Sequence, residues 1–331
     1  MNVVEALRLP GIETALGRVE DALSAATAGE DPFLNEVAVH LVRAGGKRLR
    51  PALVLASASA CGTGPDVPEE VVSGAVAVEL VHLGSLYHDD VMDEAASRRG
   101  VESANARWGN LVAILAGDFL LARASEIAAS LGTEVASLLA RTIGQLCEGE
   151  VGQLRYAFDP GRSEESYFAS IAGKTASLMA TAARVGGLTC GAPRHHVESL
   201  TEFGYSLGMT FQIWDDVRDL VSTDDDLGKP AGHDMVEGTY TLPVLRALAV
   251  PGIGGDLLSL LGVPLDAPSR DKARDLVLST SAIESSIETG REWARRARSA
   301  LEPLRRAGPT ADHVAMLAEV GDRLLDELTR P

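Results

Sequence analysis

Apolar residues recur every three to four positions along most of this chain, and few segments alternate with the period of two that a half-buried strand requires. Alanine, leucine and valine dominate the composition, and aromatic residues make up only 4% of it. A repeat of three to four places apolar side chains on one face of an α-helix. The sequence therefore predicts an all-α fold.

The predicted helices cover most of the chain and are separated by short breaks rich in glycine and proline. We expect helices at residues 11–28, 32–44, 51–61, 69–93, 110–131, 133–156, 164–190, 195–222, 239–249, 270–306 and 311–329. The sequence contains no internal repeat and no linker long enough to divide the chain. Residues 1–331 are therefore predicted to form a single large helical domain.

The composition argues against several classes of protein. With 331 residues, 46% of them hydrophobic, the chain can bury a large core. Its net charge of −17 argues against a nucleic-acid partner. The three cysteines (Cys61, Cys147 and Cys190) are an odd number and form no metal-binding or redox pair, which is typical of a cytoplasmic protein. We expect neither a signal peptide nor a membrane span, because no suitable apolar run of about 20 residues is present.

The segment LVHLGSLYHDDVMDEAASRRG, residues 80–100, runs apolar and then turns sharply acidic. Asp89 and Asp93 are four positions apart, so on a helix both side chains project from one face. Carboxylates at this spacing repel each other, and at the C-terminal end of a helix they also oppose the helix dipole. A solvated helix end remains the alternative for a single cluster of this kind.

A second acidic cluster favours a metal site over a solvated helix end. The motif FQIWDDVRD contains Asp215, Asp216 and Asp219, and it also ends an apolar helical segment. We expect the two clusters to face each other across a cavity. Carboxylates from two helices suit Mg²⁺, which takes oxygen ligands and keeps waters and substrate phosphates in its shell. Zinc is a poor fit, because cysteine is absent from both clusters and the one nearby histidine is His88.

Cationic residues accompany the acidic clusters. The motif GGKRLRP places Lys47, Arg48 and Arg50 after two glycines, which let a backbone approach a ligand closely. Arginine can grip phosphate oxygens in a bidentate fork. Further candidates are Arg98, Arg99, Lys174 with Thr175, and Lys229. Each one alone is more typical of a surface, but together they indicate diphosphate chemistry. The sequence contains no P-loop motif, so a nucleotide site of that type is not predicted.

The motifs GGKRLRP, LVHLGSLYHDDVMD with RRG, GKT, FQIWDDVRD and GKPAGHDMVEGTYTLP occur in this order. Over residues 40–246 the chain thereby resembles the all-trans polyprenyl diphosphate synthases, most closely the long-chain bacterial members. The resemblance implies the isoprenoid synthase fold, a helical bundle around a deep central cavity. It also implies a homodimer and two or three Mg²⁺ ions in each active site.

The resemblance further implies roles for individual residues. The implied metal ligands are Asp89, Asp93, Asp215 and Asp219. The implied donors to an allylic diphosphate are Arg98, Lys174, Thr175, Gln212 and Lys229, and those to isopentenyl diphosphate are Lys47, Arg50, His82 and Arg99. The catalytic set would be Asp89, Asp93, Asp215, Lys174 and Lys229. From the residues alone, a buried core histidine is the favoured interpretation of His82, and the resemblance is what favours diphosphate binding.

The implied reaction is a prenyl transfer. Metal ions and cations stabilise the departing diphosphate, so that an allylic carbocation forms and is attacked by the double bond of isopentenyl diphosphate. In this family a bulky aromatic residue five positions before the first aspartate stops chain growth early. Gly84 occupies that position, with Ser85 beside it, so we expect open space and a long product of the kind used for quinone side chains. The alternatives are that Gly84 only allows close helix packing, and that the product is geranylgeranyl diphosphate.

Some features depart from the family or favour rival functions. Thr239 stands where a lysine is frequent, and Trp214 is larger than expected. A class I terpene cyclase would share the fold, but Asp219 stands where its second motif has serine. A regulatory subunit would be expected to lack these aspartates, and both clusters are intact. A hydrophobic product also predicts contact with a membrane surface when it is released.

Overall fold

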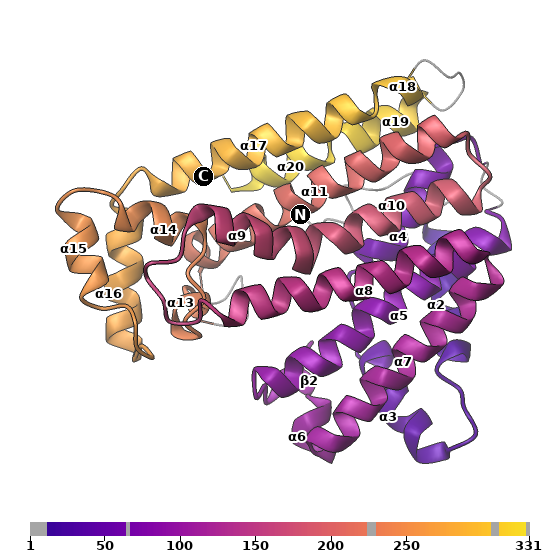
Figure 1. Ribbon diagram of the computed structural model, residues 1–331, viewed down its shortest axis with the longest axis horizontal. Coiled ribbons are helices and arrows are strands. Elements are labelled where there is room, and N and C mark those ends of the chain that lie inside the picture. The colour runs from indigo at the N-terminus through magenta and orange to yellow at the C-terminus, as the bar shows by residue number, and fades with distance from the viewer. Residues whose placement is uncertain (1–11, 64–66, 224–229, 306–310, 329–331) are drawn as a thin grey trace. The chain divides into compact units, whose positions relative to one another are not determined.

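A computed structural model describes residues 12–63, 67–223, 230–305 and 311–328 (Figure 1). In these residues the chain is helical almost throughout, which confirms the all-α prediction, and the one sheet they contain is a hairpin of two strands, each two residues long. The elements are α2 (Ile12–Ala26), α3 (Pro32–Arg43), α4 (Leu49–Ala60), α5 (Glu69–Met92), β1 (Ser97–Arg98), β2 (Val101–Glu102), α6 (Ala104–Trp108), α7 (Asn110–Ser130), α8 (Thr133–Leu154), α9 (Glu164–Ile171), η1 (Ala172–Ala176), α10 (Ser177–Thr189), α11 (Arg194–Val221), α13 (His233–Val236), α14 (Leu242–Leu248), α15 (Ile253–Leu258), α16 (Ala267–Leu278), α17 (Ala282–Ala300), α18 (Glu302–Arg305), α19 (Ala311–Ala318) and α20 (Val320–Glu327).

The long helices agree with the predicted ranges to within a few residues, but three predicted ranges are wrong in detail. The range 164–190 contains a π-helical turn, η1, between α9 and α10. The range 270–306 contains three helices: α16 ends at Leu278 with Ser279 as its C-cap, α17 begins at Ala282, whose backbone N–H donates to the Thr280 hydroxyl at 3.1 Å, and α18 follows. The range 311–329 is divided into α19 and α20. The hairpin, α6, α13 and α15 were not predicted, because elements this short show no readable period.

The residues cluster into two compact units. Unit 1 contains Met1–Ile143, Leu178–Gly204 and Ala300–Leu317. Unit 2 contains Gly144–Ser177, Tyr205–Ser299 and Ala318–Pro331. Helices α8 and α11 contribute residues to both units. The single domain spanning residues 1–331 stays a prediction.

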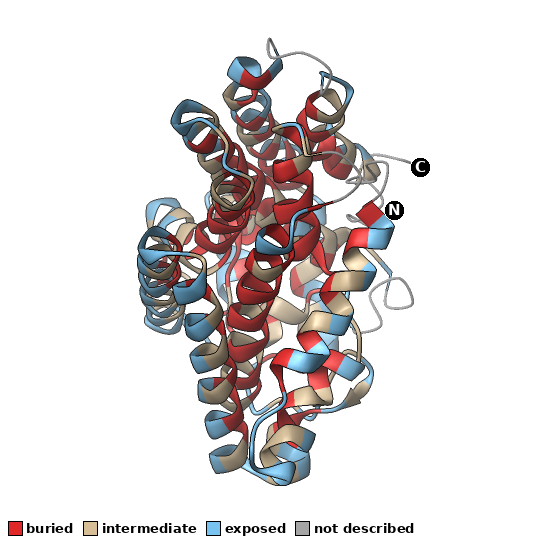
Figure 2. Ribbon diagram, turned by 90° about the vertical axis from the view of Figure 1, so that its right-hand side faces the viewer, coloured by how far each residue is buried: buried red, intermediate tan, exposed pale blue. Residues whose placement is uncertain are grey.

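Helix α5 forms the centre of unit 1, where it packs against α7, α4 and α2. Its residues are buried on nearly every side up to Tyr87, as an evenly apolar helix requires. By length and composition alone, α5 is apolar enough to cross a membrane, contrary to the sequence expectation. However, 72% of its most apolar window is buried inside the protein, as in the core helix of a globular domain. Figure 2 shows buried and exposed residues on opposite sides of many of the helices.

Unit 2 is built around the C-terminal half of α11. One hydrophobic cluster joins this half to α9, α13, α14, α15, α16 and α17. Ile213 and Val217 of α11 are fully buried in that cluster. The acidic segments 89–93 and 215–219 therefore lie toward the C-terminal ends of the long central helices of units 1 and 2, respectively.

Two of the cysteines form a pair that the sequence did not predict. Cys61 follows α4 and Cys190 follows α10, and a hydrogen bond joins the two thiols. This hydrogen bond, together with burial, raises the pKa of Cys61, and the same bond lowers the pKa of Cys190. All three cysteines are free thiols in the structure.

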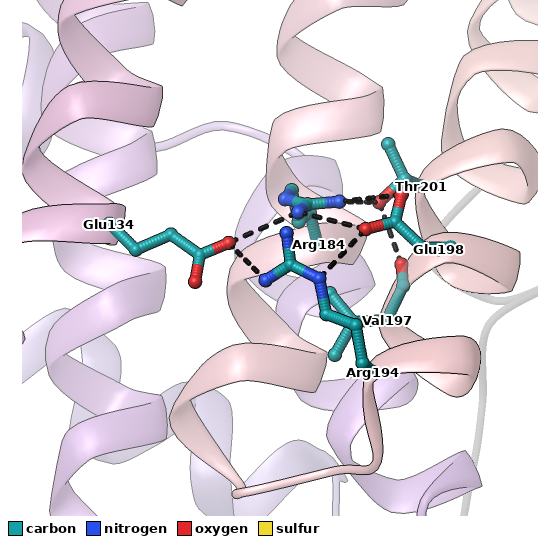
Figure 3. A network of polar contacts seen from close by, with 6 residues as sticks. All are labelled: Glu134, Arg184, Arg194, Val197, Glu198 and Thr201. Atoms are coloured by element: carbon teal, nitrogen blue, oxygen red, sulfur yellow. Dashed lines mark hydrogen bonds and ion pairs between the residues drawn. The ribbon is translucent and has the colours of Figure 1, made fainter.

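A network of charged side chains ties three helices of unit 1 together (Figure 3). The Arg184 guanidinium of α10 donates to Glu134 of α8 at 3.1 Å, and to Glu198 at 3.1 Å and Thr201 at 3.0 Å on α11. Arg194 donates to Glu134 at 2.5 Å. Hydrogen bonds from Arg194 and Arg184 lower the pKa of Glu134, and a bond from Arg184 lowers that of Glu198. Arg184 is the hub of this network because it bonds to three side chains on two other helices. Its own side chain is only 12% exposed, against 60% for that of Arg194.

We predict that Arg184→Ala lowers the free energy of unfolding by about 1–3 kcal/mol at pH 7, because it breaks several charge-assisted bonds at a mostly buried position. The exposed control Arg194→Ala should cost less than about 1 kcal/mol. Carboxylates whose pKa is lowered in the folded state stabilise it above their unfolded pKa, and this stabilisation is lost as the pH falls. The cost of Arg184→Ala, measured by urea denaturation, should therefore shrink below about pH 4. Equal costs for the two variants would contradict the assignment of Arg184 as the hub.

Candidate active site

The first acidic cluster lies where α5 ends. Asp93 is the C-cap residue, and its backbone N–H donates to the carbonyl oxygen of Asp89 at 2.8 Å. Asp89 is half-buried and Asp93 is exposed. The structure thus places these two predicted metal ligands one turn apart at a helix end.

Asp90 behaves differently from its neighbours in the same motif. Its side chain is fully buried, and it accepts a hydrogen bond from the Arg98 Nε at 2.6 Å. Burial raises the pKa of Asp90, and the positive charge of Arg98 opposes that shift. Arg98 can reach back to the helix because Ser97 and Arg98 pair with Val101 and Glu102 in the β1–β2 hairpin. Asp90 is therefore a residue that sequence reasoning missed, and it positions Arg98.

Arg99 lies against the glycine pair of the first cationic motif. A Cβ atom added to Gly46 would come within 2.8 Å of the Arg99 guanidinium carbon. That guanidinium also donates to the carbonyl oxygens of Gly45 and Leu41, the latter at 3.3 Å. The sequence expectation was that the glycines admit a ligand to the backbone. In the structure Gly46 leaves room for the Arg99 side chain, and the approach of a ligand to this backbone stays a prediction.

The residues predicted to bind isopentenyl diphosphate come from three segments of unit 1. Lys47 is exposed, whereas Arg50 and His82 are half-buried. The Nε of Arg50 is buried and has no hydrogen-bond partner in the described part of the chain. Burial, followed by the charges of Arg50 and Arg99, holds the pKa of His82 well below its usual value. His82 is therefore neutral at pH 7 and can donate one ring N–H, while the arginines supply the positive charge.

The second acidic cluster shows the same division of labour in unit 2. Asp215 is exposed, but Asp216 is 3% exposed. Asp216 accepts hydrogen bonds from the Tyr167 hydroxyl at 2.6 Å and from the Gln212 amide at 2.8 Å. Burial raises the pKa of Asp216 to about 7, and the nearby charges of Asp215 and Asp219 act in the same direction. Asp216 is thus a positioning residue, and it too was missed by sequence reasoning.

Asp219 was predicted as a metal ligand, and the structure places it in a buried setting. Its side chain is 5% exposed, and one carboxylate oxygen accepts the backbone N–H of Asp234 at 3.3 Å. The carbonyl oxygen of Asp219 accepts the N–H of Gly232 at 2.8 Å. Asp219 therefore holds the segment that follows Lys229, and Lys229 itself lies outside the described residues. The role of Asp219 toward metal remains a prediction.

The π-helical turn η1 carries Lys174 and Thr175. Glycine at 149 allows this turn to lie directly against α8, because a Cβ atom there would come within 2.8 Å of the Gly173 carbonyl carbon. Lys174 forms an ion pair with Glu150 at 2.7 Å. π-helical turns are frequent at functional sites, since they turn side chains out of the regular helical order.

Thr175 and Gln212 are brought together by a direct hydrogen bond. The Thr175 hydroxyl donates to the Gln212 side-chain oxygen at 2.6 Å, and Gln212 in turn donates to Asp216. This chain of bonds fixes the orientation of the Gln212 amide. The sequence predicted both residues as substrate donors but gave no sign of their contact.

Gly84 does not border open space, so that sequence expectation is wrong. A Cβ atom at Gly84 would come within 3.0 Å of the Gly117 carbonyl oxygen and within 3.1 Å of the Leu121 side chain. Gly84 thus permits the close approach of α5 and α7, which was the alternative interpretation. Ser85 is half-exposed, and its hydroxyl donates to the His82 carbonyl oxygen at 2.9 Å.

The two departures from the family motif lie in unit 2. Trp214 is 2% exposed, and its indole N–H has no partner among the described residues. Thr239 donates its backbone N–H to the carbonyl oxygen of Asp234 at 2.8 Å. Trp214 therefore acts as a core residue, while Thr239 closes a loop.

The donor set fits a magnesium ion. Within the described residues, no three histidine, cysteine, aspartate or glutamate side chains gather into a complete metal-binding group. The accessible carboxylates instead occur in ones and twos, as Asp89 with Asp93 and as Asp215. Mg²⁺ is typically held by one or two carboxylates together with waters and substrate phosphates, so such a set suits it.

The chain was compared with known proteins. The family model described as polyprenyl synthetase matches residues 31–256. A nonaprenyl diphosphate synthase of Mycobacterium tuberculosis is 40% identical over 303 residues, which cover 91% of this chain and 90% of the relative.

Solved structures agree with this result. A polyprenyl synthase of Caulobacter crescentus, in complex with calcium and isoprenyl diphosphate, has a TM-score of 0.88 and 31% identity, with 97% of each chain covered. A geranylgeranyl pyrophosphate synthase of Corynebacterium glutamicum, in complex with the same two ligands, has a TM-score of 0.82 and 35% identity, with 96% of each chain covered. The chain therefore belongs to the polyprenyl synthetase family, and it is a trans-prenyltransferase with the isoprenoid synthase fold.

Proposed function

We propose that this enzyme joins isopentenyl diphosphate to an allylic diphosphate in a Mg²⁺-dependent reaction, and that both acidic clusters act on the allylic diphosphate. The observation that carries the proposal is that neighbouring aspartates in each motif differ in how deeply they are buried. Asp93 and Asp215 are exposed and Asp89 is half-buried, whereas the side chains of Asp90 and Asp216 are buried and hydrogen-bonded to the protein. Support also comes from the two solved relatives described with calcium and isoprenyl diphosphate.

Each group of residues has a step in this reaction. Asp89, Asp93 and Asp215 would hold Mg²⁺, which supplies Lewis-acid stabilisation of the diphosphate as the allylic C–O bond breaks. Lys174 and the Thr175–Gln212 pair bind the same diphosphate with positive charge and oriented donors. The bonding electrons leave with the diphosphate, and an allylic carbocation remains.

The second substrate would be held in unit 1. Lys47, Arg50 and Arg99 bind its diphosphate by charge, and neutral His82 donates one N–H to it. The double bond of isopentenyl diphosphate then attacks the carbocation, a new C–C bond forms, and a proton is lost to the released diphosphate. Repetition lengthens the chain by one isoprene unit at each turn.

The product is proposed to be a long-chain polyprenyl diphosphate. The support is the 40% identity to a nonaprenyl diphosphate synthase, over nearly the whole chain. Geranylgeranyl diphosphate is the alternative, favoured by the 35% identity to a synthase of that product. Ser85 lies one helical turn before Asp89 on the same face of α5, so its size is the feature we expect to limit product length.

A homodimer is proposed from the surface of α7. Leu111 is 80% exposed and Leu115 is 62% exposed, with Ile114 between them also exposed. Large apolar side chains grouped in this way are typical of a surface that another protein covers. A cytoplasmic location is proposed from the free thiols, with membrane contact only when the apolar product is released.

Metal removal should abolish the reaction. We predict no turnover of farnesyl diphosphate and labelled isopentenyl diphosphate in EDTA, with recovery when excess Mg²⁺ is added, because no other group replaces the charge that the metal supplies. Circular dichroism in EDTA provides the control that the helices remain. Full turnover in metal-free buffer would rule out the proposed mechanism.

Asp89→Ala and Asp215→Ala should each lower kcat by at least about a hundredfold, the scale lost when one electrostatic stabiliser is removed. Both side chains are accessible, so the variants should fold like the wild type. Glu94→Ala is the matched control, since it removes an exposed carboxylate just beyond Asp93. A variant of Asp89 or Asp215 with a nearly normal kcat would assign that cluster to a solvated helix end.

Ser85→Tyr should shift the products toward shorter chains, because it adds a ring one turn from Asp89 without entering the tight contact at Gly84. Ser85→Ala is the control, since it removes the hydroxyl without adding bulk. Products from labelled isopentenyl diphosphate would be separated by reverse-phase chromatography. An unchanged length distribution in the folded Ser85→Tyr variant would place the limit on growth elsewhere.

A further inference from the structure

Beneath the proposed isopentenyl diphosphate site lies a buried ion pair that the reaction described above does not use. Arg48 and Glu79 are only 6% and 1% exposed, and Arg48 Nη1 donates to a Glu79 carboxylate oxygen at 3.1 Å. Arg48 belongs to the same motif as Lys47 and Arg50. Its guanidinium, a group that can bind phosphate, is nevertheless buried inside the protein. Such a pair is costly to bury, so its presence here calls for a functional explanation.

The contacts of Arg48 hold the turn on which its neighbours sit. Arg48 has a φ of +47°, a left-handed conformation that is unusual for a residue with a side chain, and it is the N-cap residue of α4. Its guanidinium donates to both carboxylate oxygens of Glu20 on α2 and to the carbonyl oxygen of Val42 at 3.0 Å. With Glu79 included, three separate elements fix this one side chain, and they thereby fix the direction in which Lys47 and Arg50 leave the turn.

Glu79 also acts on the other cations of the site. It lies three residues before His82 on α5, and therefore one turn away on the same face. Burial lowers the pKa values of Arg50 and Arg99. Of the neighbouring charges, that of Glu79 has the largest influence, and it raises both pKa values. Burial raises the pKa of Glu79 itself, and the charges of Arg48, Arg50 and Arg99 oppose that shift. Glu79 is thus the direct counter-ion of Arg48, and its charge also acts on Arg50 and Arg99.

We propose that Glu79 is a positioning residue for the second substrate: through its ion pair with Arg48 it fixes the turn that carries Lys47 and Arg50 before the diphosphate arrives. The inference rests on the proposed function, since it assumes that these cations bind isopentenyl diphosphate. Its physical basis is preorganisation, because cations that are already held in place lose less freedom on binding.

The direction in which the KM for isopentenyl diphosphate changes distinguishes a positioning role of Glu79 from a purely electrostatic one. Glu79 is negative and lies close to where a diphosphate would bind, so charge alone would make its removal strengthen binding. If Glu79 positions the cations, its removal weakens binding instead. The two interpretations thus predict opposite changes in the same constant.

The test is Glu79→Gln, which keeps the shape of the side chain and removes its charge. We expect the KM for isopentenyl diphosphate to rise about tenfold to a hundredfold, the range seen when a group that orients a ligand-binding residue is lost. The KM for the allylic substrate and kcat should stay within about twofold of wild type, because a purely structural loss would lower kcat or the active fraction instead. Calorimetric titration with isopentenyl diphosphate alone should show the same weakening. Glu79→Asp should partly restore the KM.

The matched control is Glu69→Gln. Glu69 is on the same helix and also pairs with an arginine, Arg18, at 2.5 Å, but its side chain is 70% exposed. Its substitution should leave every constant unchanged. If Glu79 acts through Arg48, the double variant Arg48→Gln/Glu79→Gln should raise the KM by a factor well below the product of the factors for the two single variants.

Two comparisons distinguish failure of the inference from failure of the proposed function. Arg50→Gln tests the site itself, and an unchanged KM there would overturn both. If Arg50→Gln raises the KM while Glu79→Gln leaves it unchanged or lowers it, the proposed function stands and the positioning role is overturned. Should Glu79→Gln fail to fold, Glu20→Gln removes the partly exposed second carboxylate on Arg48 and should raise the same KM. No rise in that folded variant would overturn the inference.

Discussion

The burial of α5 is the constraint on which unit 1 depends. This helix is apolar on nearly every side, so it requires neighbours all round and finds them in α2, α4 and α7. The contact with α7 is close because neither Gly84 nor Gly117 has a side chain: the Gly117 carbonyl oxygen and Leu121 occupy the space at Gly84, and the His88 ring and the Gly84 carbonyl oxygen occupy the space at Gly117. A rigid helix of this kind can hold a line of functional residues, from Glu79 through His82 to Asp89, at fixed intervals along its length.

The acidic clusters show how a folded chain gives adjacent identical residues different tasks. In each pair of aspartates the second is buried and bonded to the protein, to Arg98 in one case and to Tyr167 and Gln212 in the other. The first residue of each pair is less buried: Asp89 is half-buried and Asp215 is exposed. Like charges that crowd one metal site would repel each other, and burying one of them in hydrogen bonds limits that repulsion. The buried members also orient the cationic and amide donors that we assign to the diphosphate.

Much of this could be predicted from the sequence. The long helices follow from apolar residues that repeat every three to four positions, which is a local property. The proposed metal ligands and the proposed diphosphate-binding cations follow from ordered motifs that resemble one family. By contrast, the π-helical turn at Lys174 and the break at Thr280 interrupt otherwise helical patterns, so their detection requires the backbone itself. The hairpin that returns Arg98 to Asp90 was likewise too short to read.

The sequence by itself determined the class of fold, the family and the chemical types present at the site, because each depends on residue identity and spacing along the chain. The tertiary structure alone decided which of two neighbouring residues is buried, since burial depends on partners distant in sequence. It turned Arg48 inward to Glu20 and Glu79, 28 and 31 residues away. It also set Arg99 against Gly46 and filled the space beside Gly84 with α7. A charge or a glycine acquires its role only from the groups that folding brings within a few ångströms of it.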